Sequence, residues 1–334
     1  MFAAIIVVFT AFMWCDYYAS DVLTKAWCFV QENLPDFSSK LNKGDQTVHG
    51  SENGDSSSVS DANSSDTAAG NNNVSGDNNA NSTADVTVYF LDVGQGTSSL
   101  IVSDGEAMLI DGGGRKYSSF VVSYLKSQGI TELKYLAASH FDEDHIAGLV
   151  GVLYNFTVDT VLEPDYTADT GIYNSYQKAK NEAGLTGVNP SPGDTFSLGS
   201  CTLTLTGPTY YGHEDENNES LSFRLAAGNT SFLFMGDTEE ESEREILSSG
   251  ITVDSDVLAV AHHGSASSSC LDFLDAVSPT YGIISVGKDN SYNLPAESVL
   301  KRLSQKGITI YRTDECGTIT CHSDGNTLTW DMAS

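Results

Sequence analysis

Six consecutive residues near the middle of the chain, HFDEDH at positions 140–145, lie between a short apolar run and a segment with helical spacing. A loop that joins a strand end to a helix start can bring several side chains to one point. Two imidazoles and two carboxylates are a ligand set suited to a pair of divalent metals. A solvated acidic helix start would explain Asp142 and Asp144, but not the flanking histidines. The motif therefore predicts a metal site built from His140, Asp142, Asp144 and His145.

Two further polar groups follow apolar runs later in the chain. Asp237 comes after SFLFMG, where its carboxylate would reach between two metals; the competing interpretation is a helix N-cap for the TEEESE segment that follows. His262 and His263 come after DVLAVA. Successive side chains of a strand point to opposite faces, so we expect one histidine to bind metal and the other to form a wall of the site or contact a phosphate. Taken singly, each would more simply be a hydrogen-bonded core histidine.

Short apolar runs alternate with helical spacing from Val86 onward. VTVYFLDVG, SLIVS and AMLIDGG are typical of strands, and KYSSFVVSYLKSQGI is typical of a helix that ends at Gly129. Two groups of strands, each followed by strand-helix units, favour two mixed sheets between helix layers over one doubly wound sheet. We therefore expect an α/β sandwich over residues 86–334.

The order of the motifs LDVGQG, HFDEDH, MGD and HHGS resembles the metallo-β-lactamase superfamily, and within it the ComEC-like competence hydrolase domains. The resemblance covers about residues 86–330. It implies an αββα sandwich with a binuclear metal site where the two sheets meet, and a hydrolytic activity. These implications are expectations that the fold and the geometry of the site can test.

The resemblance also implies a role for each residue of the site. The implied ligands are His140 and Asp142 for one metal, Asp144 and His145 for the other, Asp237 as a bridge, and His262 or His263 as the late histidine, of which we take His262 as the ligand. Asp144 and His263 are the expected catalytic residues, Asp144 by holding or deprotonating the attacking water. Asp92 and Asp111 match the family's structural acids, and Asn218–Leu221 matches its Asn-x-Ser-Leu segment.

Two positions depart from the family pattern. Thr97 follows DVGQG where the family carries an aspartate, and Leu294 occupies the place of the histidine in a Gly-His-Pro motif. A leucine neither donates a proton nor contacts a phosphate, so this change bears on rate and substrate class. His213, five residues before Asn218, is a candidate replacement, although we expect an exposed loop histidine among acids.

The expected function is that of a phosphodiesterase or nuclease, as the resemblance implies. Two divalent metals would activate a shared water for attack on phosphorus. Zinc is the first expectation, and the carboxylate ligands leave manganese as the alternative. Two other functions stay open: hydrolysis of a small ester or a cell-wall choline phosphodiester, and metal-stabilised binding without catalysis.

The charge of the chain limits how it can hold nucleic acid. It has 45 acidic and 16 basic residues, a formal net charge of -29. Duplex binding draws most of its affinity from Lys and Arg that neutralise phosphates, so binding through a basic surface is excluded. A phosphodiester substrate such as single-stranded DNA is then expected to bind weakly, with the metals contacting the phosphate. The sequence indicates no protein partner.

The first part of the chain differs in composition from the rest. Met1–Cys15 is almost wholly apolar, and we expect residues 1–37 to be a membrane anchor or signal segment; the alternative is a buried amphipathic helix continuing through Asp21 to Asn33. Residues 38–85 are rich in Ser, Asn, Asp and Gly and predict a flexible linker. This order favours an extracellular location, membrane-anchored or secreted.

Overall fold

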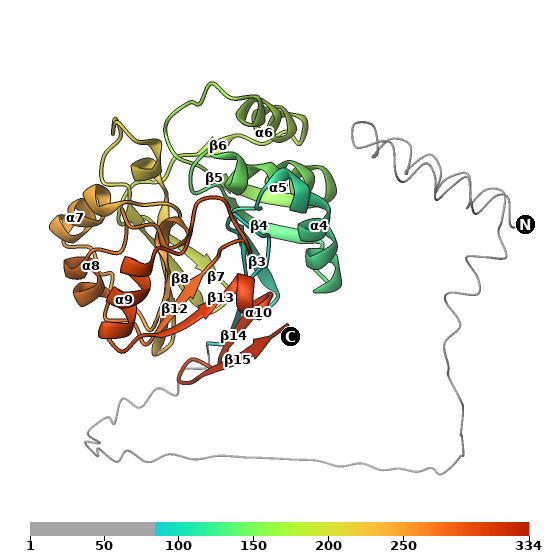
Figure 1. Ribbon diagram of the computed structural model, residues 1–334. Coiled ribbons are helices and arrows are strands. Elements are labelled where there is room, and N and C mark those ends of the chain that lie inside the picture. The colour runs from blue at the N-terminus through green and yellow to red at the C-terminus, as the bar shows by residue number, and fades with distance from the viewer. Residues whose placement is uncertain (1–83, 334) are drawn as a thin grey trace, which may run out of the picture. The chain divides into compact units, whose positions relative to one another are not determined.

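A computed structural model describes residues 84–333 (Figure 1). The predicted anchor at residues 1–37 and nearly all of the predicted linker at 38–85 lie outside the described residues. Over the described part of the chain, no helix is both long enough and apolar enough to span a bilayer. The boundaries of these N-terminal segments stay predictions.

The first sheet has eight strands in the order β15-β14-β1-β2-β3-β4-β5-β6. Strands from β15 to β3 pair antiparallel, and strands from β3 to β6 pair parallel. The bounds are β1 Val86–Phe90, β2 Ser99–Ser103, β3 Glu106–Ile110, β4 Glu132–Ala137, β5 Thr157–Leu162, β6 Gly187–Val188, β14 Ile319–Ser323 and β15 Leu328–Met332.

The second sheet has seven strands in the order β13-β12-β11-β10-β9-β8-β7. Here β7 to β10 pair antiparallel and β10 to β13 pair parallel. The bounds are β7 Thr195–Leu198, β8 Cys201–Gly207, β9 Ser222–Ala227, β10 Thr230–Phe234, β11 Val257–Ala259, β12 Tyr281–Ile284 and β13 Thr309–Arg312.

Helices cover the outer face of each sheet, α4 to α6 on the first and α7 to α9 on the second (Figure 1). The bounds are α4 Ser118–Ser127, α5 Glu143–Asn155, α6 Gly171–Glu182, α7 Glu240–Ser249, α8 Leu271–Val277, α9 Glu297–Gln305 and α10 Thr313–Cys316, with short 3₁₀ turns η1 Arg115–Tyr117, η2 Glu216–Glu219 and η3 Ala261–Gly264. The helix predicted to end at Gly129 is α4, and Gly129 has a φ of +74°, a conformation that glycine adopts without steric cost.

Three apolar layers hold the sandwich together. Alternate residues of β1, Val86, Val88 and Phe90, face the second sheet, and the Phe90 ring stacks on Phe234 of β10 with centroids 6.0 Å apart. Burying a side chain such as Phe90 contributes about 1.5–3 kcal/mol. The outer faces form two further layers, the first sheet against α4–α6 and the second against α7–α9. The predicted α/β sandwich of two mixed sheets between helices is confirmed.

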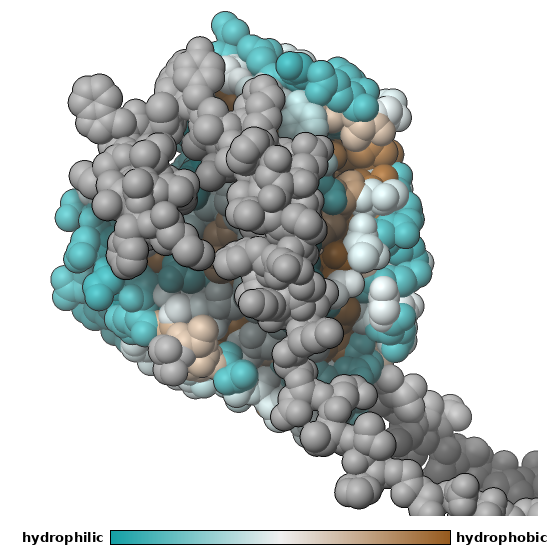
Figure 2. All heavy atoms as spheres, turned by 90° about the vertical axis from the view of Figure 1, so that its right-hand side faces the viewer, coloured by the Kyte–Doolittle hydropathy of each residue, from teal (hydrophilic) through white to brown (hydrophobic). Residues whose placement is uncertain are grey.

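The surface of the folded part is polar over much of its area, as the acidic composition requires. Figure 2 shows one face, where hydrophilic side chains gather along the margins and hydrophobic side chains form a narrower band between them. The chain has 45 acidic residues and only 16 basic ones, so most of the acidic side chains have no basic side chain to pair with.

The ends of parallel strands from both sheets supply the predicted site. Asp111 follows β3, the HFDEDH loop follows β4, Asp237 follows β10, and the two adjacent histidines follow β11. Parallel strands end at the same edge of a sheet, which is where ligands bind in open α/β sheets. The topology therefore explains why Asp111 and His263, 152 positions apart in the sequence, meet at one place.

Candidate metal centre

Asp111 is the buried acid around which the centre is organised. Its side chain is fully buried. Its Oδ1 accepts the backbone N–H of Ser139 at 2.8 Å, and its Oδ2 accepts the Ser139 hydroxyl at 2.7 Å and His145 Nδ1 at 2.9 Å. These side-chain hydrogen bonds all go to Ser139, which precedes the HFDEDH loop, and to His145 at its end, as expected for a structural acid.

Three histidines each donate Nδ1–H to a fixed acceptor. His145 donates to Asp111, His140 donates to Ser139 Oγ at 3.0 Å, and His263 donates to the backbone carbonyl of Ser285 at 2.9 Å. Such outer partners set the tautomer and orientation of a metal-binding imidazole. In each ring, Nε2 is left as the atom that can offer a lone pair.

These Nε2 atoms converge on Asp237. The distances to its carboxylate oxygens are 4.0 Å from His140, 3.3 Å from His145 and 3.5 Å from His263. All three Nε2 atoms and Asp237 Oδ1 are buried without a hydrogen-bond partner. Buried polar atoms are nearly always partnered in native proteins, so this set fits the donor arrangement of a metal site.

Asp144 approaches the same point from the first turn of α5. Its Oδ2 lies 3.3 Å from His263 Nε2, and its side chain is 35% exposed. Its backbone carbonyl accepts the N–H of Thr97 at 3.2 Å, and a Cβ on Gly96 would lie only 2.4 Å from that oxygen. The LDVGQG loop thus packs directly on Asp144, and only glycine fits at position 96.

Two of the predicted ligands lie at the outer side of the centre. Asp142 precedes α5 with a side chain that is 56% exposed, and its Oδ2 is 3.8 Å from His140 Nε2. His262 Nε2 lies 3.8 Å from Asp237 Oδ2, and its Nδ1 lies 3.3 Å from Glu239 Oε1. Both side chains therefore reach the cluster, but from positions open to solvent.

The side chains of His262 and His263 do not point to opposite faces, as successive side chains of a strand would. Both lie in the turn η3 after β11 has ended, with φ values of +50° for His262 and +53° for His263. Because the turn removes the alternation of faces, both rings point toward Asp237. Of the two, His263 is buried and meets Asp144 and His145 in a group whose ligand atoms lie within 4.8 Å of one another.

Asp237 does not cap the helix that follows it. The N-cap of α7 is Glu239, and Asn218 Oδ1 accepts the N–H groups of Glu239 and Ser242 at 3.1 and 3.3 Å. Ser220 Oγ accepts the N–H of Asp237 at 3.2 Å. The Asn218–Leu221 segment therefore supports Asp237 and relieves it of a capping role.

Burial and charge set opposite protonation tendencies within the centre. Burial alone would raise the pKa of Asp237 and Asp144, but His145 and His263 hold the pKa of both carboxyls well below the usual range. Burial alone would lower the pKa of His263, but Asp237 and Asp144 raise it to about 10. Burial alone would also lower the pKa of His145, but Asp237 and Asp111 raise it well above its usual value. Burial and the neighbouring His145 lower the pKa of His140.

The prediction of an exposed His213 was wrong. Its side chain is excluded from solvent, with Nδ1 3.3 Å from Glu219 Oε1 and Nε2 3.1 Å from Glu245 Oε2. Both ring nitrogens are therefore engaged away from the centre. Leu294 packs against the apolar layer under α7–α9, so the leucine at this position serves packing.

The sequence did not point to two supporting residues, Ser139 and Ser285. Ser139 acts through its hydroxyl in a strand-end loop, and Ser285 acts through its backbone carbonyl. Ser220, which accepts the N–H of Asp237, belongs to the Asn218–Leu221 segment matched in the sequence. Ser139 directly precedes the first histidine of the HFDEDH motif, which is the one hint the sequence offered. Asp92 accepts the N–H of Gly94 at 3.1 Å and so shapes the LDVGQG loop.

Two mixed sheets between helices, with histidines and carboxylates gathered at their strand ends, define a metal-binding hydrolase fold. Residues 91–288 match the model of the metallo-beta-lactamase superfamily, and the chain belongs to this superfamily.

Two curated relatives and one solved structure are similar to this chain. It is 29% identical over 250 residues to ComE operon protein 3 of Bacillus subtilis strain 168, covering 70% of this chain and 32% of that protein. It is 31% identical over 240 residues to competence protein ComA of Neisseria gonorrhoeae, covering 71% and 32%. The metallo-beta-lactamase fold protein YhfI from Bacillus subtilis is 13% identical, with a TM-score of 0.49, covering 74% of this chain and 100% of that one. The chain thus spans about a third of the length of these two curated relatives.

Proposed function

We propose that this chain is a metal-dependent phosphodiesterase, most directly a nuclease, that uses two divalent cations. The observation that carries the proposal is the convergence of His140, His145 and His263 Nε2 with Asp237 Oδ1, all buried and without hydrogen-bond partners. In a packed core these atoms would be paired. Their number and chemistry fit cations of the zinc and manganese class.

The ligand atoms form two groups that overlap at His145. Ligand atoms of His140, His145 and Asp237, and of Asp144, His145 and His263, lie within 4.8 Å of one another. One imidazole nitrogen binds one cation, so Asp237 is the residue with an oxygen for each. His140 and Asp142 would hold one cation, Asp144, His145 and His263 would hold the other, and Asp237 would offer a carboxylate oxygen to each, with His262 at the outer edge.

When bound, the cations would place positive charge against a phosphate and lower the pKa of a water molecule toward neutrality. The residues of the chain orient this chemistry. Asp111 and the Ser285 carbonyl fix the rings of His145 and His263. Asp144 is ionised and partly exposed, so its Oδ2 would accept the proton of the attacking water from the solvent side.

The relatives support a phosphodiester as substrate. One is named competence protein ComA and another, from Haemophilus influenzae, recombination protein 2. Competence and recombination both concern DNA, whose backbone is a phosphodiester. The acidic chain offers few basic side chains for phosphates, so we infer weak binding in which the cations make the main phosphate contacts.

The purified full chain, loaded with zinc or with manganese, tests the proposal. We expect about two metal ions per chain, hydrolysis of bis(p-nitrophenyl) phosphate and single-stranded DNA, and loss of both activities in Asp144→Ala. Small esters and choline phosphodiesters complete the panel. Bound metal without hydrolysis of any substrate would support a binding module instead, and a strong preference for an ester would contradict the phosphodiesterase.

The proposed place of action is outside the cell membrane. The apolar Met1–Cys15 followed by the polar segment 38–85 supports a folded domain held away from a membrane. Protease added to intact cells should then degrade the domain. Protection until the cells are lysed would contradict an external location.

A further inference from the structure

The loop from Ser285 to Ala296, between β12 and α9, is attached to the metal centre at both ends. Its first residue, Ser285, accepts Nδ1–H of His263 at 2.9 Å, and its last residue, Ala296, donates its N–H to the Gly264 carbonyl at 2.9 Å. Pro295 also packs on Gly264, where an added Cβ would lie 2.7 Å from the proline ring. The loop therefore leaves and rejoins the fold beside His263.

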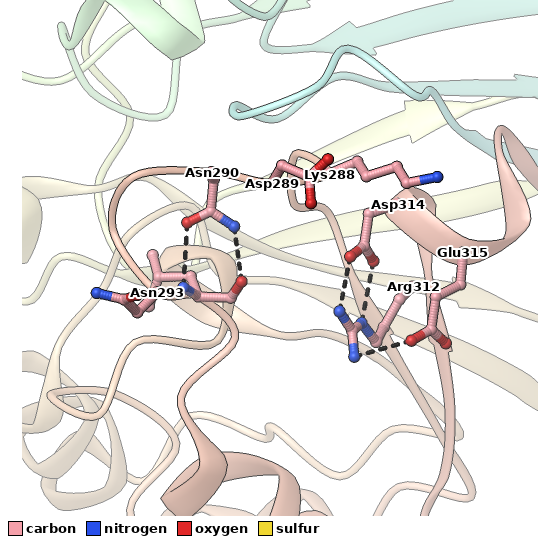
Figure 3. A pocket seen from close by; sticks show the side chains of 8 residues that line it. Lys288, Asp289, Asn290, Asn293, Arg312, Asp314 and Glu315 are labelled. Atoms are coloured by element: carbon pink, nitrogen blue, oxygen red, sulfur yellow. Dashed lines mark hydrogen bonds and ion pairs between the residues drawn. The ribbon is translucent and has the colours of Figure 1, made fainter.

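Asn290 holds this loop in one shape. Its Nδ2 donates to the carbonyls of Gly287 and Leu294 at 2.9 and 2.7 Å, and its Oδ1 accepts the N–H groups of Tyr292 and Leu294, both at 3.1 Å (Figure 3). A single side chain thus closes the loop from inside. The tip between Lys288 and Asn293 is presented in a fixed conformation.

A cavity of about 540 Å³ opens beside the tip, a volume in the range of small-molecule sites. Lys288, Asn290 and Asn293 line it from the loop, and Arg312 lines it from the end of β13 (Figure 3). Arg312 is neutralised by Asp314 at 2.6 Å and Glu315 at 2.9 Å. Lys288 is exposed and has no ion pair within residues 84–333, so its charge is available to a ligand.

Tyr292 lies on the same tip but outside the set of residues that line the cavity, and it is 69% exposed. Its backbone N–H is held by Asn290, and its ring is open to solvent. An exposed aromatic ring is a stacking surface, and the faces of all nucleobases stack on such rings. Lysine contacts phosphate as a point charge. The tip thus combines the two elements with which proteins hold a nucleotide in a single strand.

We propose that the tip of the Ser285–Ala296 loop binds the substrate nucleotide next to the cleaved phosphodiester, with Tyr292 stacked on its base and Lys288 against its phosphate. The inference rests on the proposed function. Asp289, Asp314 and Glu315 surround the cavity with negative charge, which disfavours further phosphates. The subsite therefore accepts one nucleotide and leaves the rest of the strand in solvent.

The test compares two single-stranded oligonucleotides of equal length, one with bases and one abasic at every position, on the full-length metal-loaded protein. Tyr292→Ala is expected to raise KM for the base-bearing strand about tenfold and to leave KM for the abasic strand unchanged. Tyr292→Phe keeps the ring and should behave as wild type. Lys288→Ala should raise KM for both strands, with an effect that shrinks as salt increases.

Matched controls are Tyr154→Ala, which removes an aromatic side chain that is 54% exposed on α5, and Lys301→Ala on α9. Neither should change KM. If wild type cuts both strands and Tyr292→Ala affects them equally or not at all, the subsite is refuted while the phosphodiesterase stands. If wild type cuts neither strand, the proposed function fails and the subsite fails with it.

Discussion

The metal centre and the loop that carries His213 place the same kinds of side chain in buried surroundings. In the centre, His140, His145 and His263 each commit one ring nitrogen to a neighbour and leave Nε2 without a partner. In the loop, His213 commits both nitrogens, to Glu219 and Glu245, and its ring packs on Tyr210 with centroids 4.3 Å apart. A histidine with both nitrogens engaged ties two elements together, whereas one with a free Nε2 has a nitrogen available to a ligand.

This difference also separates two kinds of carboxylate. Both carboxylates have one buried oxygen without a hydrogen bond, Asp237 Oδ1 and Glu219 Oε2. They differ in their neighbours: the Nε2 atoms of four histidines lie within 4.0 Å of Asp237, whereas Glu219 Oε1 accepts the N–H groups of Gly212 and His213 at 2.6 and 2.8 Å. Removing the first should cost function, and removing the second should cost only local stability.

Asp237→Asn should have the largest effect, because it removes the one carboxylate that lies near every imidazole of the centre. Metal centres supply several kcal/mol of transition-state stabilisation, so kcat should fall by at least about a thousandfold. Metal content by mass spectrometry should drop as well. Glu219→Gln is the matched variant in the loop that carries His213, and it should keep its metal. Loss of metal in that variant would show that the two carboxylates do not differ in metal binding.

Asp111→Asn should have a smaller effect, because Asp111 acts through His145 and Ser139. Loss of such an outer partner costs about 10–100-fold in metal affinity or activity. A matched control exists in Asp256, whose Oδ2 accepts the N–H and hydroxyl of Ser231 at 2.8 and 3.1 Å, far from any histidine of the centre. Asp256→Asn should leave metal affinity unchanged; an equal loss in both variants would show a general effect on folding.

The fold followed from periodicity, because apolar alternation and helical spacing are local properties of the chain. The strand and helix that flank HFDEDH are β4 and α5, and the two-sheet sandwich predicted from their order is the one observed. The groups near strand ends could also be found from the sequence, since Asp111 directly follows β3 and Asp237 lies three residues after the end of β10. The sheet topology then places these residues, which are far apart in the sequence, close together in space.

What the sequence did not reveal depends on contacts between distant residues. The engagement of His213 requires Glu245, 32 positions away, and the orientation of His263 requires the carbonyl of Ser285, 22 positions away. The choice between His262 and His263 depended on where β11 ends, since a strand would separate the rings and a turn does not. Each of these is a tertiary property without a local pattern.

Metal affinity should rise with pH, because His145 and His263 hold protons in the metal-free protein. Burial alone would lower the pKa of both, but neighbouring carboxylates outweigh it and raise the pKa of His263 to about 10. For each proton that must leave, metal affinity rises about tenfold per unit increase in pH, as long as the pH is below the pKa of that group. Titration calorimetry in two buffers of different ionisation enthalpy measures the protons released; equal heats at pH 7 to 9 would contradict the prediction.

His213→Ala should have the smallest effect on the centre. It leaves the buried Glu219 and the carboxylate of Glu245 without their shared donor, which costs about 1–3 kcal/mol of unfolding free energy. Because no ring nitrogen of His213 faces Asp237, metal content and kcat should stay at wild-type values while the midpoint of urea unfolding falls. His322→Ala, at a side chain that is 47% exposed, should change neither quantity. A His213→Ala protein that folds with wild-type stability but loses metal would make His213 a ligand and reverse the distinction between the two regions.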